Sequence, residues 1–110
     1  MNSKIRLVKD YIAPNGKNVF GEWLDSLTDM KAQLIVDKRI TKLRQGVMGD
    51  CEYVGRGVSE LKIHYGPGYR IYFGQMGKTV VLLLCGGIKK TQREDISKAW
   101  ECLDEYKRRV

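Results

Sequence analysis

Basic and aromatic side chains gather on two short alternating segments that flank a Gly-Pro-Gly turn at residues 66–68. This pattern predicts a β-hairpin, in which successive side chains point to opposite faces. One face carries Glu60, Lys62, His64, Arg70 and Tyr72. A symmetric turn places His64 opposite Arg70, about 5 Å apart at Cβ. It also places Lys62 opposite Tyr72. Because like charges repel at such distances, we expect this face to bind a polyanion.

A second group of cations follows the next predicted strand. The apolar run at residues 79–85 predicts a strand that is covered on both faces or lies centrally in the sheet, and Gly86-Gly87 is predicted to end it. Lys89 and Lys90 come directly afterwards. We therefore expect these two lysines to join the cations of the hairpin in one cluster.

A helix is predicted to begin beside these lysines. Thr91 and Glu94 have the spacing of a capping box, which indicates a helix N-terminus, and Gln92 lies in its first turn. Backbone N–H groups at such a terminus attract anions. The apolar stripe predicted to pack this helix is Ile96, Ala99, Trp100 and Leu103.

Such a cluster suits a scissile phosphate. Arg70 offers paired donors to a phosphate whose negative charge grows in the transition state. Neighbouring cations lower the pKa of a lysine, so Lys62 or Lys89 is predicted to exchange a proton near neutral pH. Tyr72 is predicted to stack on a base or to orient a phosphate.

The same residues also have a purely structural explanation. The hairpin face is then a solvated sheet surface on which Glu60 pairs with Lys62. His64 is then a neutral surface residue rather than an acid, a base or an RNA contact. The residues by themselves leave both explanations open.

Two further helices are predicted before the hairpin. A strand at residues 4–11 is followed by a short helix that Asn18 caps. A second helix opens at Thr28 or Asp29 and runs to Gln45. The apolar side chains that predict packing of both helices on a sheet are Val19, Phe20, Trp23, Leu24 and Leu27, then Ala32, Ile35, Val36, Ile40 and Leu43.

Length and composition narrow the function classes. The 110 residues fit one domain spanning residues 1–110, and the net charge of +7 favours acidic partners such as nucleic acid or an acidic protein. Three widely spaced cysteines fit reduced thiols, and no metal site or cofactor motif is visible. The chain has neither an apolar signal region nor a stretch long enough to span a membrane. We therefore expect a cytoplasmic location and no membrane partner.

Four motifs resemble the RelE/ParE toxin superfamily, and most closely its HigB-like branch of addiction-module killer proteins. They are Phe20-x-x-Trp23-Leu24, Gly55-x-Gly57-Val-Ser-Glu60-Leu-Lys62, Gly66-Pro-Gly-Tyr-Arg70-Ile-Tyr72-Phe and Leu82-Leu-Leu-Cys-Gly-Gly-Ile-Lys89-Lys-Thr-Gln92. The resemblance runs from Tyr11 to Trp100. It implies an α+β, RelE/ParE-like fold, in which two N-terminal helices and a C-terminal helix pack on a mainly antiparallel sheet of four to five strands.

The resemblance also implies the toxin half of a type II toxin–antitoxin module, whose partner is a small, often helix-turn-helix, antitoxin. Ribonuclease members of the superfamily cut mRNA on the ribosome without a metal, because the RNA 2′-OH attacks the adjacent phosphate and leaves a cyclic phosphate. By position, Lys62, Arg70 and Lys89 take the catalytic places. The residues expected to contact RNA are His64, Tyr72, Lys90 and Gln92. No small-molecule substrate is implied.

The chain departs from the pattern of the branch at three places. Lys62 stands where arginine is common, Ile88 replaces an acidic residue, and the C-terminal Lys-Arg-Arg-Val lacks the tyrosine or histidine of some ribonuclease members. Two other functions stay open. ParE-like relatives inhibit DNA gyrase by binding it without cutting RNA, and a decayed toxin keeps only antitoxin binding. The grouped cations favour RNA over gyrase.

Overall fold

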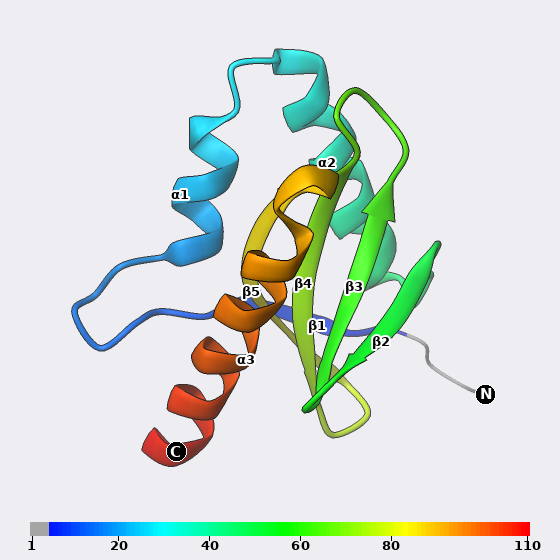
Figure 1. Cartoon of the computed structure of the whole chain (residues 1–110). Helices are drawn as coiled ribbons and strands as arrows, with labels where there is room; N and C mark the ends of the chain where they lie inside the picture. The colour runs from blue at the N-terminus through cyan, green and yellow to red at the C-terminus, as the bar shows by residue number, and fades with distance from the viewer. Residues whose placement is uncertain (1–4) are drawn as a thin grey trace.

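A computed structural model describes residues 5–110, which form three α-helices and a five-stranded mixed sheet (Figure 1). In chain order the elements are β1 (Leu7–Asp10), α1 (Val19–Ser26), α2 (Met30–Arg44), β2 (Cys51–Gly55), β3 (Val58–Ile63), β4 (Tyr69–Met76), β5 (Val80–Ile88), a 3₁₀ turn (Lys89–Thr91) and α3 (Gln92–Arg109). The strand order is β1-β5-β4-β3-β2, with β1 parallel to β5 and every other pairing antiparallel. The expected α+β class with a mainly antiparallel sheet is confirmed.

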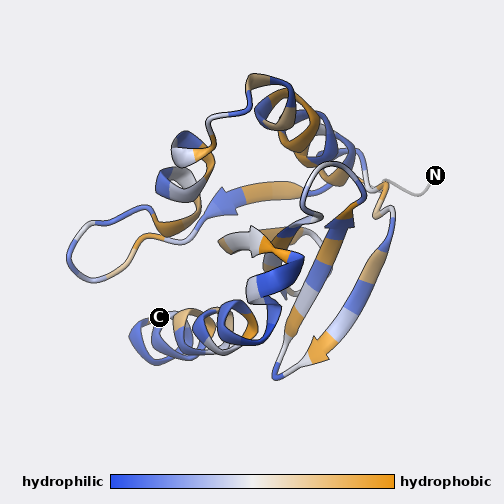
Figure 2. Cartoon of the chain, turned by 45° about the horizontal axis from the view of Figure 1, so that its top comes forward, coloured by the Kyte–Doolittle hydropathy of each residue, from blue (hydrophilic) through white to orange (hydrophobic). Residues whose placement is uncertain are grey.

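Helices cover both faces of the sheet, with α2 and α3 on opposite sides of the strands (Figure 2). On one face, Phe20 of α1 and Val36 of α2 belong to the same buried cluster as Leu83. On the other face, Leu103 of α3 packs in a cluster with Leu82. The two leucines lie on β5, so this strand is covered on both sides, as its apolar sequence predicts.

The N-termini of α1 and α2 are held by the side chains that the sequence indicates. Asn18 Oδ1 accepts a hydrogen bond from the N–H of Gly21 at 2.8 Å. Asp29 Oδ1 accepts from the N–H groups of Lys31 and Ala32 at 2.9 and 3.2 Å. These bonds satisfy donors that have no partner within a helix. Both predicted helix starts are confirmed, the second with Asp29 as its cap.

The Gly86-Gly87 pair does not end β5, which continues to Ile88. The predicted end of the strand is wrong, because the two glycines allow other elements to pack closely against the strand. A Cβ atom on Gly86 would lie 2.2 Å from the Trp23 ring, and one on Gly87 would lie 1.8 Å from the Asp95 carboxylate. The missing side chains let α1 and α3 approach the strand closely.

The first strand is shorter than predicted. β1 covers Leu7–Asp10 and pairs with β5 at one edge of the sheet. Lys4, its predicted start, lies outside the described residues. Within residues 5–110, no helix is both long enough and apolar enough to cross a bilayer.

Candidate functional site

The polar face of the β3–β4 hairpin carries the expected residues in a different register. Lys62 lies opposite Arg70, and Glu60 lies opposite Tyr72. The predicted pairing of Lys62 with Tyr72 is therefore wrong by two residues. So is the predicted pairing of His64 with Arg70, since β3 ends before His64. Lys62 and Arg70 are consequently the two cations that meet directly.

The loop between the two strands explains the shift. β3 ends at Ile63, and residues 64–68 form the connection instead of a tight turn at 66–68. The N–H of Gly68 donates to the carbonyl of Tyr65 at 3.0 Å, and the φ angle of Gly68 is +81°, which glycine adopts without strain. Because the shift is an even number of residues, the predicted faces of the strands are correct.

Arg70 is a buried cation without a hydrogen-bond partner in the described part of the chain. Only 6% of the residue is exposed, and its buried Nε–H donates to no hydrogen-bond acceptor among the described residues. Within residues 5–110, no hydrogen bond or ion pair joins its side chain to another residue. On the side of β5 it lies opposite Gly87, which has no side chain. Burial of a charge without a partner is costly, so an anion at this place would be strongly stabilising.

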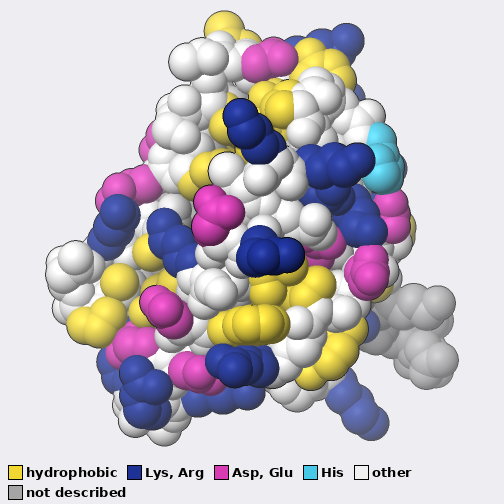
Figure 3. Space-filling view, viewed as in Figure 1, with side chains coloured by type: hydrophobic (Ala, Val, Ile, Leu, Met, Phe, Trp, Pro, Cys, Tyr) yellow, Lys and Arg dark blue, Asp and Glu magenta, His cyan; other side chains and the backbone are white. Residues whose placement is uncertain are grey.

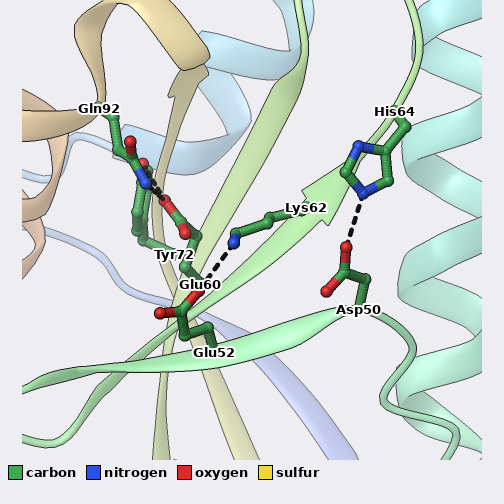
Figure 4. Close-up of polar contacts among 7 residues, drawn as sticks. All are labelled: Asp50, Glu52, Glu60, Lys62, His64, Tyr72 and Gln92. Atoms are coloured by element: carbon green, nitrogen blue, oxygen red, sulfur yellow. Dashed lines mark hydrogen bonds and ion pairs between the residues drawn. The ribbon is translucent and has the colours of Figure 1, made fainter.

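Glu60 is the centre of a buried polar network and is only 1% exposed. Its Oε2 accepts hydrogen bonds from the Tyr72 hydroxyl at 2.9 Å and from the Gln92 amide at 2.7 Å (Figure 4). Its Oε1 is buried with no hydrogen-bond partner in the described part of the chain. The carboxylate thus joins β3 to β4 and to the first residue of α3.

Glu60 is not among the site residues predicted from the sequence. The available signal was the apolar stripe of α3, since a helix that packs on this sheet face must bury some of its polar residues. A carboxylate enclosed in that way needs donors, and Tyr72 and Gln92 supply them.

Tyr72 lies too deep for the contact that the sequence suggests. None of the residue is exposed, so its ring is not available to stack on an RNA base. Burial is the largest cause that raises the pKa of Tyr72, and the hydrogen bond to Glu60 is the second. The hydroxyl therefore stays protonated and remains a donor. We therefore assign Tyr72 to holding Glu60 in place.

Lys62 pairs with Glu52 of β2 rather than with Glu60, with Nζ 2.7 Å from Oε1 (Figure 4). The hydrogen bond that Lys62 donates to Glu52 is the largest of several effects that raise the pKa of Lys62. The predicted lowering of this pKa is wrong, because the charges nearest Lys62 are carboxylates. The suggested Glu60–Lys62 pair is replaced by the Glu52–Lys62 pair. Glu52 is 63% exposed in its side chain, so water reaches this pair and makes it weak.

The remaining predicted residues lie around this centre. His64 Nε2 is 2.6 Å from Asp50 Oδ2, and this contact is the largest of the effects that lower the pKa of Asp50. Lys89 and Lys90 are exposed on the 3₁₀ turn. The N–H of Lys89 donates to the carbonyl of Gly68 at 2.8 Å, which ties that turn to the hairpin loop. Figure 3 shows basic side chains on this face with carboxylates among them.

The start of α3 is not a capping box. Thr91 occupies the N-cap position, but its side chain makes no hydrogen bond to the N–H groups of the helix. Its hydroxyl donates instead to Asp95 Oδ2 at 2.5 Å. The Asp95 carboxylate fills the space beside Gly87, which explains why it displaces Glu94 as the partner.

Cysteines and potential metal ligands are dispersed. Cys51, Cys85 and Cys102 are all free, which agrees with the expected reduced thiols. Across residues 5–110, no group of three or more His, Cys, Asp or Glu side chains is placed to hold a metal ion.

Comparison with known proteins gives one clear relationship. No protein-family model matches the sequence. The chain is similar to an uncharacterized protein of Haemophilus influenzae, with 41% identity over 80 residues. The matched region covers 73% of this chain and 81% of that protein. The chain belongs to the same protein family as this Haemophilus influenzae protein.

Proposed function

We propose that this protein is the toxin of a type II toxin–antitoxin module, of the HigB-like branch of the RelE/ParE superfamily, and that it is an mRNA interferase. The observation that carries the proposal is Arg70, a buried guanidinium with no hydrogen-bond partner among residues 5–110, directly opposite Lys62. A phosphate is the anion whose geometry best matches a guanidinium. The net charge of +7 favours a polyanion as the source of that phosphate.

The lysines around Arg70 fit the same substrate. Among residues 5–110, Lys62 forms its ion pair with the exposed Glu52, and a phosphate can replace that carboxylate because solvent-exposed pairs contribute little. Lys89 and Lys90 are exposed on a turn that is bonded to the hairpin loop. A phosphate on Arg70 would thus meet cations from β3 and from the turn before α3.

In the proposed reaction the ribose 2′-oxygen attacks the adjacent phosphorus. The new bond joins that oxygen to phosphorus, the bond to the 5′-oxygen of the next nucleotide breaks, and a cyclic phosphate remains. Arg70 and Lys62 stabilise the negative charge that builds on the phosphate oxygens. The 2′-OH loses a proton and the leaving 5′-oxygen gains one. Because Lys62 is paired with Glu52, we assign to the Lys89 ammonium the proton that the leaving 5′-oxygen gains, and the proton of the 2′-OH passes to water.

The proposed partner is an antitoxin, a small helix-turn-helix protein whose acidic segment covers the cations. Pairing between exposed charges weakens as salt is added. The affinity of this complex should therefore fall between low and high ionic strength. An affinity that does not depend on salt would contradict neutralisation by charge pairing.

The test is induction of the chain in growing bacteria, with mapping of new mRNA 5′ ends. We expect growth arrest with cut messages. Arg70→Ala and Lys89→Ala should abolish both effects while the purified variants keep their helical circular dichroism. Lys38→Ala, an exposed lysine on α2, is the matched control and should stay toxic.

Other outcomes would identify other functions. Growth arrest with intact messages and lost gyrase supercoiling would identify a ParE-like inhibitor. Unchanged growth, with binding of the antitoxin retained, would identify a decayed toxin. Either result would refute the ribonuclease.

A further inference from the structure

We propose that a groove between β2 and α3 binds the base of the nucleotide next to the scissile phosphate; this inference rests on the function proposed above. The groove has a volume of about 340 Å³. Its lining residues are Val54, Gln92, Arg93, Ile96, Ser97 and Trp100. A base that enters it would fix which nucleotide lies beside the cut.

The lining has the mixed chemistry that a base needs. Val54, Ile96 and Trp100 offer apolar surface, and the other lining residues contribute an amide, a hydroxyl and a guanidinium. Proteins recognise single-stranded RNA by packing the faces of splayed bases on apolar or aromatic groups and by hydrogen-bonding the base edges. Trp100 is fixed in the wall, because its Nε1–H donates to the carbonyl of Gly55 at 3.0 Å.

One residue joins the groove to the polar network around Glu60. Gln92 belongs to both, because it lines the groove and donates to the buried Glu60. Val54 lies two residues along β2 from Glu52, the partner of Lys62, which is roughly 7 Å of strand. An RNA strand with a phosphate at Arg70 would therefore have its neighbouring base within reach of the groove.

The charges along the groove match RNA. Arg93 lines it, and the guanidinium of Arg56 lies 4.6 Å from the Trp100 ring centroid. Arg56 has a φ angle of +53°, a conformation in which glycine or asparagine would be less strained. An arginine held there at a cost in backbone strain indicates a role for its charge. Figure 3 shows hydrophobic surface between basic side chains on this face of the molecule.

Fluorescence of Trp100 tests the proposal without relying on cleavage. The chain has two tryptophans, so Trp23→Phe leaves Trp100 as the single reporter. The probes are a 2′-O-methylated hexanucleotide, which lacks the attacking hydroxyl, and the same backbone without bases. We expect the hexanucleotide to change Trp100 emission and to bind about tenfold more tightly than the abasic strand, the scale of one stacked base.

Two substitutions that leave the net charge unchanged distinguish binding in the groove from binding elsewhere on the surface. Ser97→Phe fills the groove from an exposed position on α3 and should weaken binding of the hexanucleotide about tenfold, but not binding of the abasic strand. Thr41→Phe adds the same ring at an exposed position on α2 and should leave both affinities unchanged.

The outcomes distinguish the groove from the function on which it rests. If the hexanucleotide and the abasic strand bind with equal affinity, and Arg70→Ala weakens the binding of both, the groove does not bind a base. That result would leave the RNA site at Arg70 intact. Binding of neither strand by the parent protein would overturn the RNA site itself. A Ser97→Phe variant that binds RNA with the affinity of the parent but no longer binds the antitoxin would show that the groove binds a peptide. That result also overturns the proposal.

Discussion

The hydroxyl of Tyr72 on β4 donates a hydrogen bond to the carboxylate of Glu60 on β3, 2.9 Å away and fully enclosed. Gln92 at the start of α3 donates to the same oxygen. The same two strands carry two buried polar atoms without hydrogen-bond partners in residues 5–110, Glu60 Oε1 and Arg70 Nε. Folding alone does not favour such an arrangement, so it indicates a face prepared for a ligand.

Replacement of Arg70 should separate stability from function. We expect Arg70→Met to be more stable than the parent by at least about 1 kcal/mol in urea unfolding, because a buried charge without a partner is replaced by an apolar chain. The same variant should lose growth arrest and RNA binding. Arg109→Met is the control, since Arg109 bonds to Glu105 and to the carbonyl of Ile12, and it should not gain stability. A less stable Arg70→Met protein would show that this arginine serves the fold.

The Tyr72 hydroxyl should govern part of the stability at alkaline pH. Its pKa is raised in the folded state, so the unfolded chain releases this proton first, at a pH of about 10. The contribution is fully present below that pH and is lost as the pH rises further, by up to about 1.4 kcal/mol per pH unit. Tyr72→Phe should therefore lose stability less steeply above pH 10 than the parent does.

Urea unfolding at pH 8 to 11 measures this difference. Other tyrosines and the thiols also titrate in that range, and comparison of two variants removes their common effect. Tyr53→Phe, at a residue that is 66% exposed, is the control and should follow the slope of the parent. Parallel curves for the parent and Tyr72→Phe would contradict the role assigned to the buried hydroxyl.

Two substitutions of Glu60 should differ in their effects on stability. Glu60→Ala leaves the Tyr72 hydroxyl buried without an acceptor and should cost about 1–3 kcal/mol. Glu60→Gln keeps an acceptor oxygen of the same shape and should cost less. Because Glu60→Gln removes a negative charge that acts on Lys62, it should also bind the hexanucleotide more tightly than the parent. Weaker binding by a well-folded Glu60→Gln protein would show that the substrate needs the carboxylate itself.

Removal of the exposed partner of Lys62 should improve RNA binding. Glu52→Gln breaks the Glu52–Lys62 pair, lowers the pKa of Lys62 toward its ordinary value and leaves the ammonium free for a phosphate. Glu22→Gln makes the same change in net charge at the Lys17 pair, where the two charges are 3.5 Å apart. We expect the first variant to bind the hexanucleotide more tightly than the second at low salt. Equal affinities would mean that only net charge matters.

The sequence by itself determined the local elements and the faces of the hairpin. The caps by Asn18 and Asp29 and the apolar stripes of the helices follow from residues within a few positions of one another, which is the range over which caps and periodicity act. Strand alternation likewise placed Lys62 and Arg70 on one face. The residue types for an anion site were therefore readable before any fold was known.

Only the tertiary structure decided how those residues are used. The length of the hairpin loop set Lys62 against Arg70, and the packing of α3 buried Glu60 and Tyr72 beneath it. Gly86 and Gly87 continued their strand because Trp23 and Asp95, from other elements, fill the space beside them. Each result depends on segments far apart in the chain, whose contacts no local pattern encodes. Burial and pairing of the charges arise when the sheet, the turn and α3 come together.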